Sequence, residues 1–247
     1  MRIYRIKKLL KIIAKTLYLL WLLKFLANNL GESCMQTYIF DFDGTLADSG
    51  KTGILATQDA FKDFSLPIPD YKTVNYYMGI PIEVSFKKMA PQHVFNEQEF
   101  KDLMDCFREH YKKNELANIT LFNGILPTLQ TLTQRSKSLY VVSSKNSVAL
   151  LRNLENLKIK KYFTDVIGSD QVQHFKPAPD GVLSIINKYH LNSDDCIMIG
   201  DAIFDLRMGK SAGVHTCGVT WGAHDPDSLL KEKPDFLLSK AEELLTI

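Results

Sequence analysis

From Met35 onward, short apolar runs alternate with stretches of helical character, and this alternation restricts the possible fold more than any other feature. The runs lack a strict apolar–polar alternation, which is typical of strands buried on both faces. Strands separated by helices predict right-handed βαβ units and a parallel sheet. The predicted strands are Thr37–Phe42, Ser138–Ser143, Asp165–Gly168, Cys196–Gly200, Val214–Val219 and Asp235–Leu238. The helices predicted between them are Gly124–Arg135, Ser147–Leu157, Asp180–Tyr189 and Asp205–Ala212.

Residues 50–122 interrupt this rhythm, because they contain helical patterns and no strand pattern. The predicted helices are Thr52–Phe64, Ile82–Met89 and Glu97–Asn114. An all-helical block between the first two strands of a sheet indicates an inserted domain. The predicted fold class is therefore α/β, a Rossmann-like parallel sheet flanked by helices with an inserted all-helical domain. Residues 35–49 and 123–247 would form the α/β core, and residues 50–122 the inserted domain.

Residues 1–34 form a basic and apolar extension with seven Lys or Arg residues and one acid, whereas the other 213 residues hold 23 basic and 27 acidic ones. A mildly acidic body argues against a broad nucleic-acid surface. The longest uncharged run before Lys24 is eight residues, well short of the roughly 20 that span a bilayer. Three readings stay open: an amphipathic helix that contacts a membrane peripherally through residues 1–30, a signal anchor, or a dispensable extension.

The four cysteines lie far apart in the sequence without a C-x-x-C pair, and the six histidines show no H-x-x-x-H spacing. This pattern indicates neither a zinc site nor a disulfide framework. Reduced thiols in the cytoplasm are the expected state.

Carboxylates follow two of the predicted strands, at the edge where parallel sheets bind ligands. Asp41 and Asp43 follow the first strand, and Asp201 and Asp205 follow the fourth. A buried carboxylate is costly unless it is paired or bound to a metal. Taken alone, however, Asp43 with Gly44 fits a turn, and Asp205 fits an acid at a helix N-terminus. Neither pair is diagnostic by itself.

The second and third strands are followed by hydroxyls and a lysine. Ser143, Ser144 and Lys145 stand at a helix start, where hydroxyls and free N–H groups bind phosphate, although a simple N-cap explains them equally well. Lys176 stands between backbone segments stiffened by two prolines, although a lone lysine is usually a solvated surface charge. Together the strand ends deliver Asp-x-Asp, Ser, Lys and Asp-x-x-x-Asp, which is far more specific than any part of it.

The series D-F-D-G-T-L (41–46), V-V-S-S-K (141–145), K-P-x-P-D (176–180) and G-D-x-x-x-D (200–205) resembles the haloacid dehalogenase superfamily of phosphohydrolases. It looks most like the phosphoglycolate-phosphatase-like branch, in which a helical cap stands between the first two motifs. The resemblance covers essentially residues 35–247. It implies a Mg²⁺-dependent phosphoric monoester hydrolase that acts on a small phosphorylated metabolite, phosphoglycolate-like, through an aspartyl-phosphate.

The resemblance also implies roles for individual residues. Asp41 is expected to be the nucleophile, and Asp43 the general acid and base. Ser143 is expected to hydrogen-bond the transferring phosphoryl group, and Lys176 to neutralise it. The expected metal ligands are Asp41, Asp43 through its backbone carbonyl, Asp201 and Asp205. The expected phosphate-binding set is Gly44, Thr45, Ser143, Ser144 and Lys176.

Departures from the family pattern bear on the type of reaction. Ser143-Ser144 stands where Thr-Asn is more common, so the hydroxyl is kept while substrate contacts can differ. Thr45 favours hydrolysis over phosphomutases, which usually have a valine-like residue there. Asp43 argues against dehalogenase chemistry, which lacks this second aspartate.

Several readings of the function stay open. A phosphomutase and a pyrophosphatase are the alternatives within the same architecture, and the complete set of charged residues disfavours a non-catalytic scaffold. Substrate choice is expected to rest with the cap, where Glu83, Lys87 and Lys88 are candidates, although solvated helix charge explains them too. Neither the substrate nor the oligomeric state follows from the sequence.

Overall fold

The computed structural model describes residues 35–247. The chain divides into two units, Met1–Cys34 and Met35–Ile247, and the predictions for residues 1–34 lie outside the described residues. Within the described unit, none of the helices combines the length and apolar character that crossing a bilayer requires.

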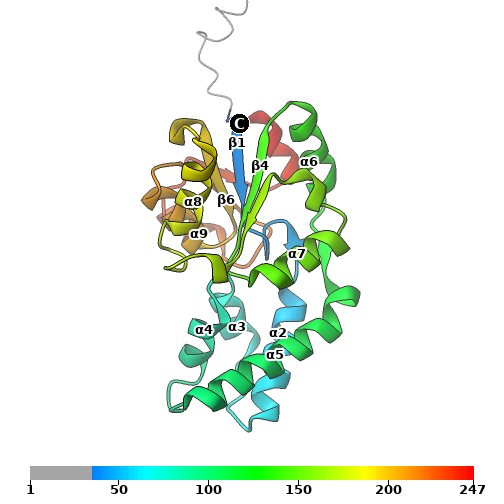
Figure 1. Ribbon diagram of the computed structural model, residues 1–247, viewed down its shortest axis with the longest axis vertical. Coiled ribbons are helices and arrows are strands. Elements are labelled where there is room, and N and C mark those ends of the chain that lie inside the picture. The colour runs from blue at the N-terminus through cyan, green and yellow to red at the C-terminus, as the bar shows by residue number, and fades with distance from the viewer. Residues whose placement is uncertain (1–34) are drawn as a thin grey trace, which may run out of the picture. The chain divides into compact units, whose positions relative to one another are not determined.

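A six-stranded parallel sheet organises the unit, in the order β5-β4-β1-β6-β7-β8 (Figure 1). The six predicted strands are confirmed, with ends displaced by at most two residues. The strands are β1 (Thr37–Phe40), β4 (Ser138–Val142), β5 (Asp165–Ile167), β6 (Cys196–Gly200), β7 (His215–Val219) and β8 (Phe236–Leu238).

Helices cover both faces of this sheet, and alternate side chains of β1 pack against different sets of them. Tyr38 and Phe40 belong to one buried cluster, with side chains of α6 and α7, whereas Ile39 belongs to another, with side chains of α8 and α9. Figure 1 shows these two pairs of helices on opposite sides of the strands. The helices of this region are α6 (Ile125–Gln134), α7 (Ser147–Asn156), α8 (Asp180–Tyr189), α9 (Ile203–Ser211) and α10 (Pro226–Lys231). Short 3₁₀ turns lie at Lys160–Tyr162 (η1), Ser169–Gln171 (η2), Ser193–Asp195 (η3) and Ala241–Thr246 (η4).

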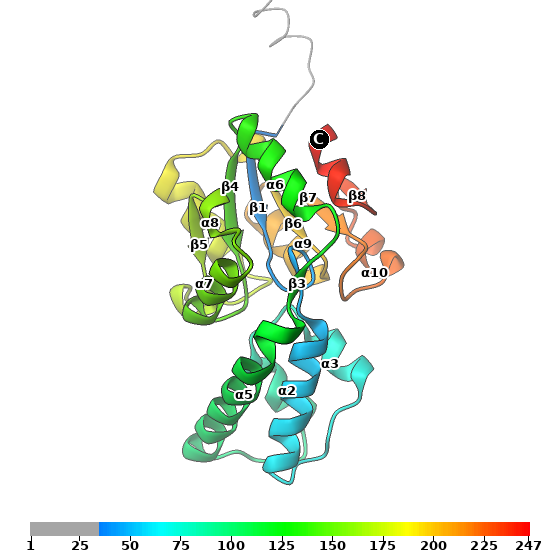
Figure 2. The same cartoon turned by 90° about the vertical axis from the view of Figure 1, so that its right-hand side faces the viewer.

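Residues 50–118, here called the helical segment, form four helices beyond the carboxyl ends of β1 and β4 (Figure 2). They are α2 (Gly50–Asp63), α3 (Tyr71–Tyr77), α4 (Ile82–Met89) and α5 (Glu97–Asn118). Phe86 joins three of these helices, because its ring meets those of Phe61 and Phe107 edge to face at centroid distances of 5.1 and 5.2 Å. Such aromatic pairs add to the stability that their burial provides.

Two details of the sequence prediction are wrong in this region. Residues 50–122 are not helical throughout, because β3 (Thr120–Leu121) pairs antiparallel with β2 (Ala47–Asp48) where the chain leaves and re-enters the core. The sequence also failed to indicate α3, whose β-branched and aromatic residues are mediocre helix formers. Its N-cap supplies what propensity does not, since the Asp70 carboxylate accepts a hydrogen bond from the Thr73 amide at 2.7 Å.

Candidate active site

Asp41 follows β1 directly and is buried, with 2% of its surface exposed. Its amide still donates into the sheet, to the carbonyl of Ile199 at 2.9 Å. Its Oδ1 accepts a hydrogen bond from Nζ of Lys176 at 2.7 Å. Burial raises the pKa of Asp41 well above its ordinary value; Lys176 opposes this shift, and the carboxylates of Asp205 and Asp201 add to it. The ionised form of this carboxyl group is therefore costly, and a cation nearby would reduce the cost.

Lys176 joins the first and last motifs of the predicted site. Its buried Nζ donates to Oδ1 of Asp41 and to Oδ1 of Asp205, each at 2.7 Å. Burial alone would lower the pKa of Lys176, but these two carboxylates outweigh it and raise the pKa above its ordinary value. The lysine therefore remains charged at the strand ends.

Asp201 and Asp205 come from the end of β6 and the first turn of α9, and both are buried. Oδ1 of Asp201 accepts from the Thr45 hydroxyl at 2.9 Å, and Oδ2 accepts from the Ala223 amide at 2.6 Å. Oδ2 of Asp205 accepts from the Ala202 amide at 3.1 Å. Burial, together with the charge of Asp205, raises the pKa of Asp201 to about 7. These contacts fix both carboxylates beside Asp41.

Gly44 allows the chain to turn sharply away from β1 next to Asp201. Its φ is +83°, and a Cβ at this position would lie 2.2 Å from Oδ2 of Asp201. Thr45 is fully buried, and its carbonyl accepts a hydrogen bond from Nε1 of Trp221 at 3.0 Å. A larger residue at 44 would displace the carboxylate that Thr45 binds.

The carboxylates of Asp41, Asp201 and Asp205 form a group whose potential ligand oxygens lie within 4.8 Å of one another. All three are buried, and within residues 35–247 Lys176 is the basic side chain that contacts the group. Three carboxylates against one ammonium leave an excess of negative charge that a divalent cation would offset. Oxygen donors of this kind are those that Mg²⁺ prefers, so the residues fit a magnesium site. The Asp43 carboxylate is not a member of this group.

Ser143 and Ser144 lie directly after β4, on the same edge of the sheet. Ser143 is buried, and its Oγ accepts a hydrogen bond from the Lys145 amide at 3.2 Å. The Ser144 hydroxyl instead donates to the carbonyl of Gly79 at 2.8 Å, in the loop after α3. Ser144 thus connects the core with the helical segment.

Asp43 is held by a different set of contacts from Asp41. Its Oδ1 accepts from the Ser49 hydroxyl at 2.5 Å and from Nζ of Lys145 at 2.7 Å. The side chain of Asp43 is 20% exposed, against 3% for Asp41, so it faces more open space. Asp43 therefore lies two residues after Asp41 but pairs with a different lysine, Lys145 instead of Lys176.

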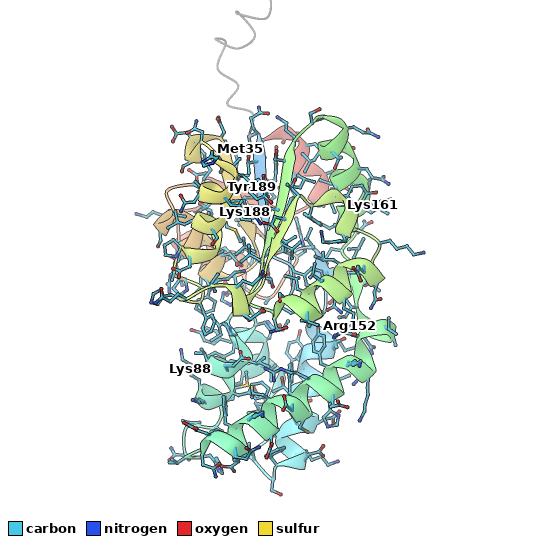
Figure 3. All side chains as sticks on the ribbon, in the orientation of Figure 1. Met35, Lys88, Arg152, Lys161, Lys188 and Tyr189 are labelled. Atoms are coloured by element: carbon cyan, nitrogen blue, oxygen red, sulfur yellow. The ribbon has the colours of Figure 1, made fainter. Side chains whose placement is uncertain are left out.

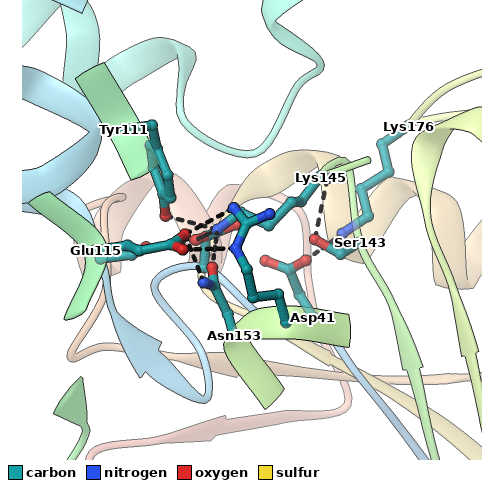
Figure 4. A network of polar contacts seen from close by, with 10 residues as sticks. Asp41, Tyr111, Glu115, Ser143, Lys145, Asn153 and Lys176 are labelled. Atoms are coloured by element: carbon teal, nitrogen blue, oxygen red, sulfur yellow. Dashed lines mark hydrogen bonds and ion pairs between the residues drawn. The ribbon is translucent and has the colours of Figure 1, made fainter. Parts of the chain in front are cut away.

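Lys145 is the centre of a buried polar network that reaches the helical segment (Figure 4). Its Nζ also donates to the hydroxyl of Tyr111 on α5 at 2.6 Å, and to Oδ1 of Asn153 on α7 at 3.1 Å. Burial lowers the pKa of Lys145, but Asp43 and Tyr111 outweigh burial and raise it above its ordinary value. Burial raises the pKa of the Tyr111 phenol to about 12, which keeps it neutral.

A buried glutamate continues this network. Glu115 of α5 accepts hydrogen bonds from Nε of Arg152 at 2.6 Å and from Nδ2 of Asn153 at 2.8 Å. Burial opposes its ionisation, yet the hydrogen bonds from Arg152 and Asn153 lower the pKa of Glu115 below its ordinary value. Arg152 lies between α7 and α5 in Figure 3. The ion pair therefore joins the core to the helical segment.

Sequence reasoning assigned no role to Lys145, Tyr111, Glu115 or Asn153. Lys145 stands in the quoted V-V-S-S-K segment, but no spacing connected it with Asp43, which is 102 residues away. A weak signal existed on α5, since Tyr111 and Glu115 are four residues apart and share one helix face. Of the three predicted substrate contacts, Glu83 lines the cavity over the strand ends. Lys87 and Lys88 are exposed and do not line this cavity.

Asp63, Cys106 and His110 form a second group of potential ligands, on the surface of the helical segment. Nε2 of His110 lies 2.8 Å from Oδ2 of Asp63. The sequence indicated no such group, because its members come from α2 and α5 and match no ligand spacing. Asp63 is exposed, and a hydrogen-bonded surface cluster explains the arrangement.

A cavity of about 310 Å³ lies over the strand ends. Asp41, Asp43 and Ser143 line it from the core together with residues at the start of α7, and helices α2, α3, α4 and α5 contribute the wall on the side of the helical segment. A space of this size suits a small organic ligand. The predicted catalytic carboxylates therefore open into a compartment shared with the helical segment.

Comparison with known proteins agrees with this arrangement. Residues 38–219 match the haloacid dehalogenase-like hydrolase family. The pyrophosphatase PpaX of Listeria monocytogenes is 30% identical over 217 residues, which cover 86% of this chain and 96% of that protein.

Solved structures of other proteins have a fold similar to that of this chain. A haloacid dehalogenase-like family hydrolase from Streptococcus pneumoniae has a TM-score of 0.76 at 28% identity, covering 86% of this chain and 98% of that one. A predicted phosphoglycolate phosphatase from Haemophilus somnus has a TM-score of 0.78 at 24% identity, covering 87% and 98%. The likeness to the Haemophilus somnus protein, at 24% identity, is evidence for the fold alone.

Proposed function

Because the chain belongs to the haloacid dehalogenase-like hydrolase family and is a phosphatase, we propose that it hydrolyses a small phosphorylated metabolite with Mg²⁺, through an aspartyl-phosphate on Asp41. The observation that carries this proposal is the convergence of Asp41, Lys176, Asp201 and Asp205 at one edge of the sheet, with Asp43 beside them. The carboxylates of this buried group can bind a cation, and the ammonium of Lys176 can bind an anionic phosphate.

Asp41 is the proposed nucleophile. Attack of its carboxylate on phosphorus forms an acyl phosphate and divides hydrolysis into two steps. An anionic carboxylate repels an anionic phosphate, and Lys176 reduces this repulsion from 2.7 Å. The contact of Lys176 with Asp205 holds the ammonium in place while Asp41 reacts.

Asp43 is the proposed general acid and base. In the first step it would protonate the leaving oxygen, and in the second it would accept a proton from the attacking water. Ser49 and Lys145 orient its carboxylate, as the contacts at 2.5 and 2.7 Å indicate. Ser143 would donate its hydroxyl to the phosphoryl oxygens, and the loop of Gly44, Thr45 and Ser144 would complete the phosphate site.

Asp41, Asp201 and Asp205 would hold the Mg²⁺, together with the backbone carbonyl of Asp43. The bound cation would supply positive charge to the phosphoryl oxygens as negative charge builds on them. Thr45 and Ala223 would keep Asp201 oriented toward it.

The helical segment is the proposed cap domain, with boundaries at residues 50–122, against a core of residues 35–49 and 123–247. The polar contacts of Ser144 with Gly79 and of Arg152 with Glu115 support a cap that docks on the core. A cytoplasmic location, and peripheral membrane contact through residues 1–30, remain predictions from the sequence.

A pyrophosphatase is the second candidate, and the likeness to PpaX favours it. A phosphomutase is the third, and Thr45 argues against it. The test is release of inorganic phosphate from p-nitrophenyl phosphate with Mg²⁺ by the wild type, by Asp41→Asn and by the matched exposed variant Asp194→Asn. Loss of release in Asp41→Asn alone supports the proposal, whereas equal activity of the three proteins contradicts it.

A further inference from the structure

Apolar side chains make up most of the cavity wall that the helical segment supplies. They come from α3, α4, α5 and the loop between α3 and α4, and include Met78, Ile80, Ile82, Phe86, Met89 and Phe107. Phe86 and Phe107 are buried, and the others are partly exposed to the cavity and solvent. A wall of this kind favours a ligand group that gains free energy by leaving water.

The charged groups on the wall give it no surplus of positive charge. Its basic side chains are Arg108, Lys112, Lys145 and Arg152, and its acidic ones are Asp41, Asp43, Glu83 and Glu109. The two sets are equal in number, and Asp41 and Asp43 belong to the catalytic group.

Three of the four basic side chains are already bound to carboxylates. Nζ of Lys145 lies 2.7 Å from Oδ1 of Asp43. Arg152 pairs with Glu115 at 2.6 Å, and Arg108 pairs with Glu83 at 3.0 Å.

The fourth, Lys112, is exposed on α5, three residues after the exposed Glu109. Residues three apart share a helix face, so the opposite charge of Glu109 lies near that of Lys112 in exposed surroundings, although the described residues form no ion pair between the two. The wall therefore offers a second anionic group of a substrate little to bind.

We propose that the substrates are phosphate monoesters of uncharged, mainly apolar alcohols, whose alcohol part occupies this cavity. The proposal rests on the proposed function, because it places the phosphorus at Asp41. The bond from phosphorus to the alcohol oxygen breaks as the bond to Asp41 forms, and Asp43 gives the alcohol oxygen its proton. Water then replaces Asp41 on phosphorus, so one ester and one water yield one alcohol and one phosphate.

Phosphoglycolate and pyrophosphate are then poor substrates. Each would bring a second anionic group, a carboxylate or a phosphate, against apolar side chains and paired ions. Such a group loses its hydration without gaining a partner. An alkyl chain instead gains free energy when it leaves water, and each methylene that it buries is expected to raise kcat/KM about fourfold.

The experiment measures phosphate release by the wild type with Mg²⁺ from ethyl, butyl and hexyl phosphate, phosphoglycolate and pyrophosphate. The expected kcat/KM rises along the alkyl series by about fourfold per methylene, and the value for hexyl phosphate exceeds those for phosphoglycolate and pyrophosphate. A flat alkyl series overturns the proposal, and so does a higher kcat/KM for phosphoglycolate or pyrophosphate.

Two variants locate the effect in the cavity. Met78→Lys adds a cation to the wall, and it is expected to lower kcat/KM for hexyl phosphate at least tenfold while raising it for phosphoglycolate. Val94→Lys adds the same charge to the helical segment outside the cavity, at a side chain that is 93% exposed, and keeps the wild-type order of substrates. An unchanged order in Met78→Lys contradicts the assignment of the alcohol part to this wall.

Binding to Asp41→Asn separates this proposal from the proposed function. Calorimetry with hexyl phosphate and with phosphoglycolate, both with Mg²⁺, reports the preference of the cavity without turnover. Tighter binding of hexyl phosphate shows the cavity preference that the proposal requires, and if the wild type then releases no phosphate, the failure lies in the proposed function. Tighter binding of phosphoglycolate overturns the proposal even if the wild type is an active phosphatase.

Discussion

The hydroxyl of Tyr111 crosses from α5 to the core and binds the same ammonium that holds Asp43. Tyr111→Phe deletes this hydroxyl alone, because the ring keeps its packing with Phe107 at a centroid distance of 5.7 Å. The lost contact is 2.6 Å long and engages a charged donor that burial protects from water. Hydrogen bonds to charged groups contribute about 1.5 to 3 kcal/mol to the free energy of unfolding.

The lower end of this range applies, because Lys145 keeps Asp43 and Asn153 as acceptors in the variant. A loss of about 1.5 kcal/mol corresponds to a decrease in Tm of about 3 to 6 °C for a unit of this size. Urea unfolding of the wild type, Tyr111→Phe, Lys145→Met and the double variant measures the coupling free energy between the two side chains.

Tyr71→Phe is the matched control, since Tyr71 is 62% exposed. Its free energy of unfolding is expected to stay within about 0.5 kcal/mol of the wild type. A coupling free energy below about 0.5 kcal/mol between Tyr111 and Lys145 would refute the inference that this contact joins α5 to the Asp43 network.

Three further predictions follow from the site. Lys176→Met is expected to abolish phosphate release and to lower the free energy of unfolding by about 3 to 5 kcal/mol, because it leaves two buried carboxylates without their cation. The control is Lys188→Met, at a side chain that is 60% exposed. Equal effects in the two variants would contradict the assignment of Lys176 to the active site. Gly44→Ala is expected to unfold at a lower urea concentration than Gly53→Ala, because its Cβ would meet Asp201 at 2.2 Å in a left-handed backbone conformation, and equal midpoints would refute this. Without metal, the raised pKa of Asp201 gives a contribution to the stability of the fold that is complete below the unfolded pKa and is lost as the pH rises through about 7. Mg²⁺ is therefore expected to raise the Tm more at pH 8 than at pH 5. An equal increase at both pH values would show that this carboxylate does not bind the cation.

The sheet could be predicted because its signal is local. The apolar runs of β1, β4 and β6 read as buried strands on composition alone, and right-handed crossovers then place their carboxyl ends on one edge. The meeting of Asp41, Lys176 and Asp201 follows from that topology together with the motifs. The turn at Gly44 was equally readable, because a glycine after two aspartates marks a sharp exit from a strand.

The missing parts depend on contacts that the sequence does not announce. Lys145 follows the motif serines as an ordinary helix-start residue would, and only the three-dimensional fold brings its Nζ to Asp43 of the core and to Tyr111 of α5. Glu115 looks like a solvated helix charge until Arg152 and Asn153 cover it. The two-residue strand β3 is too short to produce a periodic pattern, and it exists because β2 pairs with it.

The stereochemical course at phosphorus tests the central claim most directly, that the phosphoryl group passes first to Asp41 and then to water. The substrate is an aryl phosphate made chiral with oxygen isotopes, hydrolysed by the wild type with Mg²⁺ in isotopically labelled water to give chiral phosphate. Two successive in-line displacements predict net retention of configuration. Net inversion would mean a single attack by water, and it would contradict the assignment of Asp41 as nucleophile.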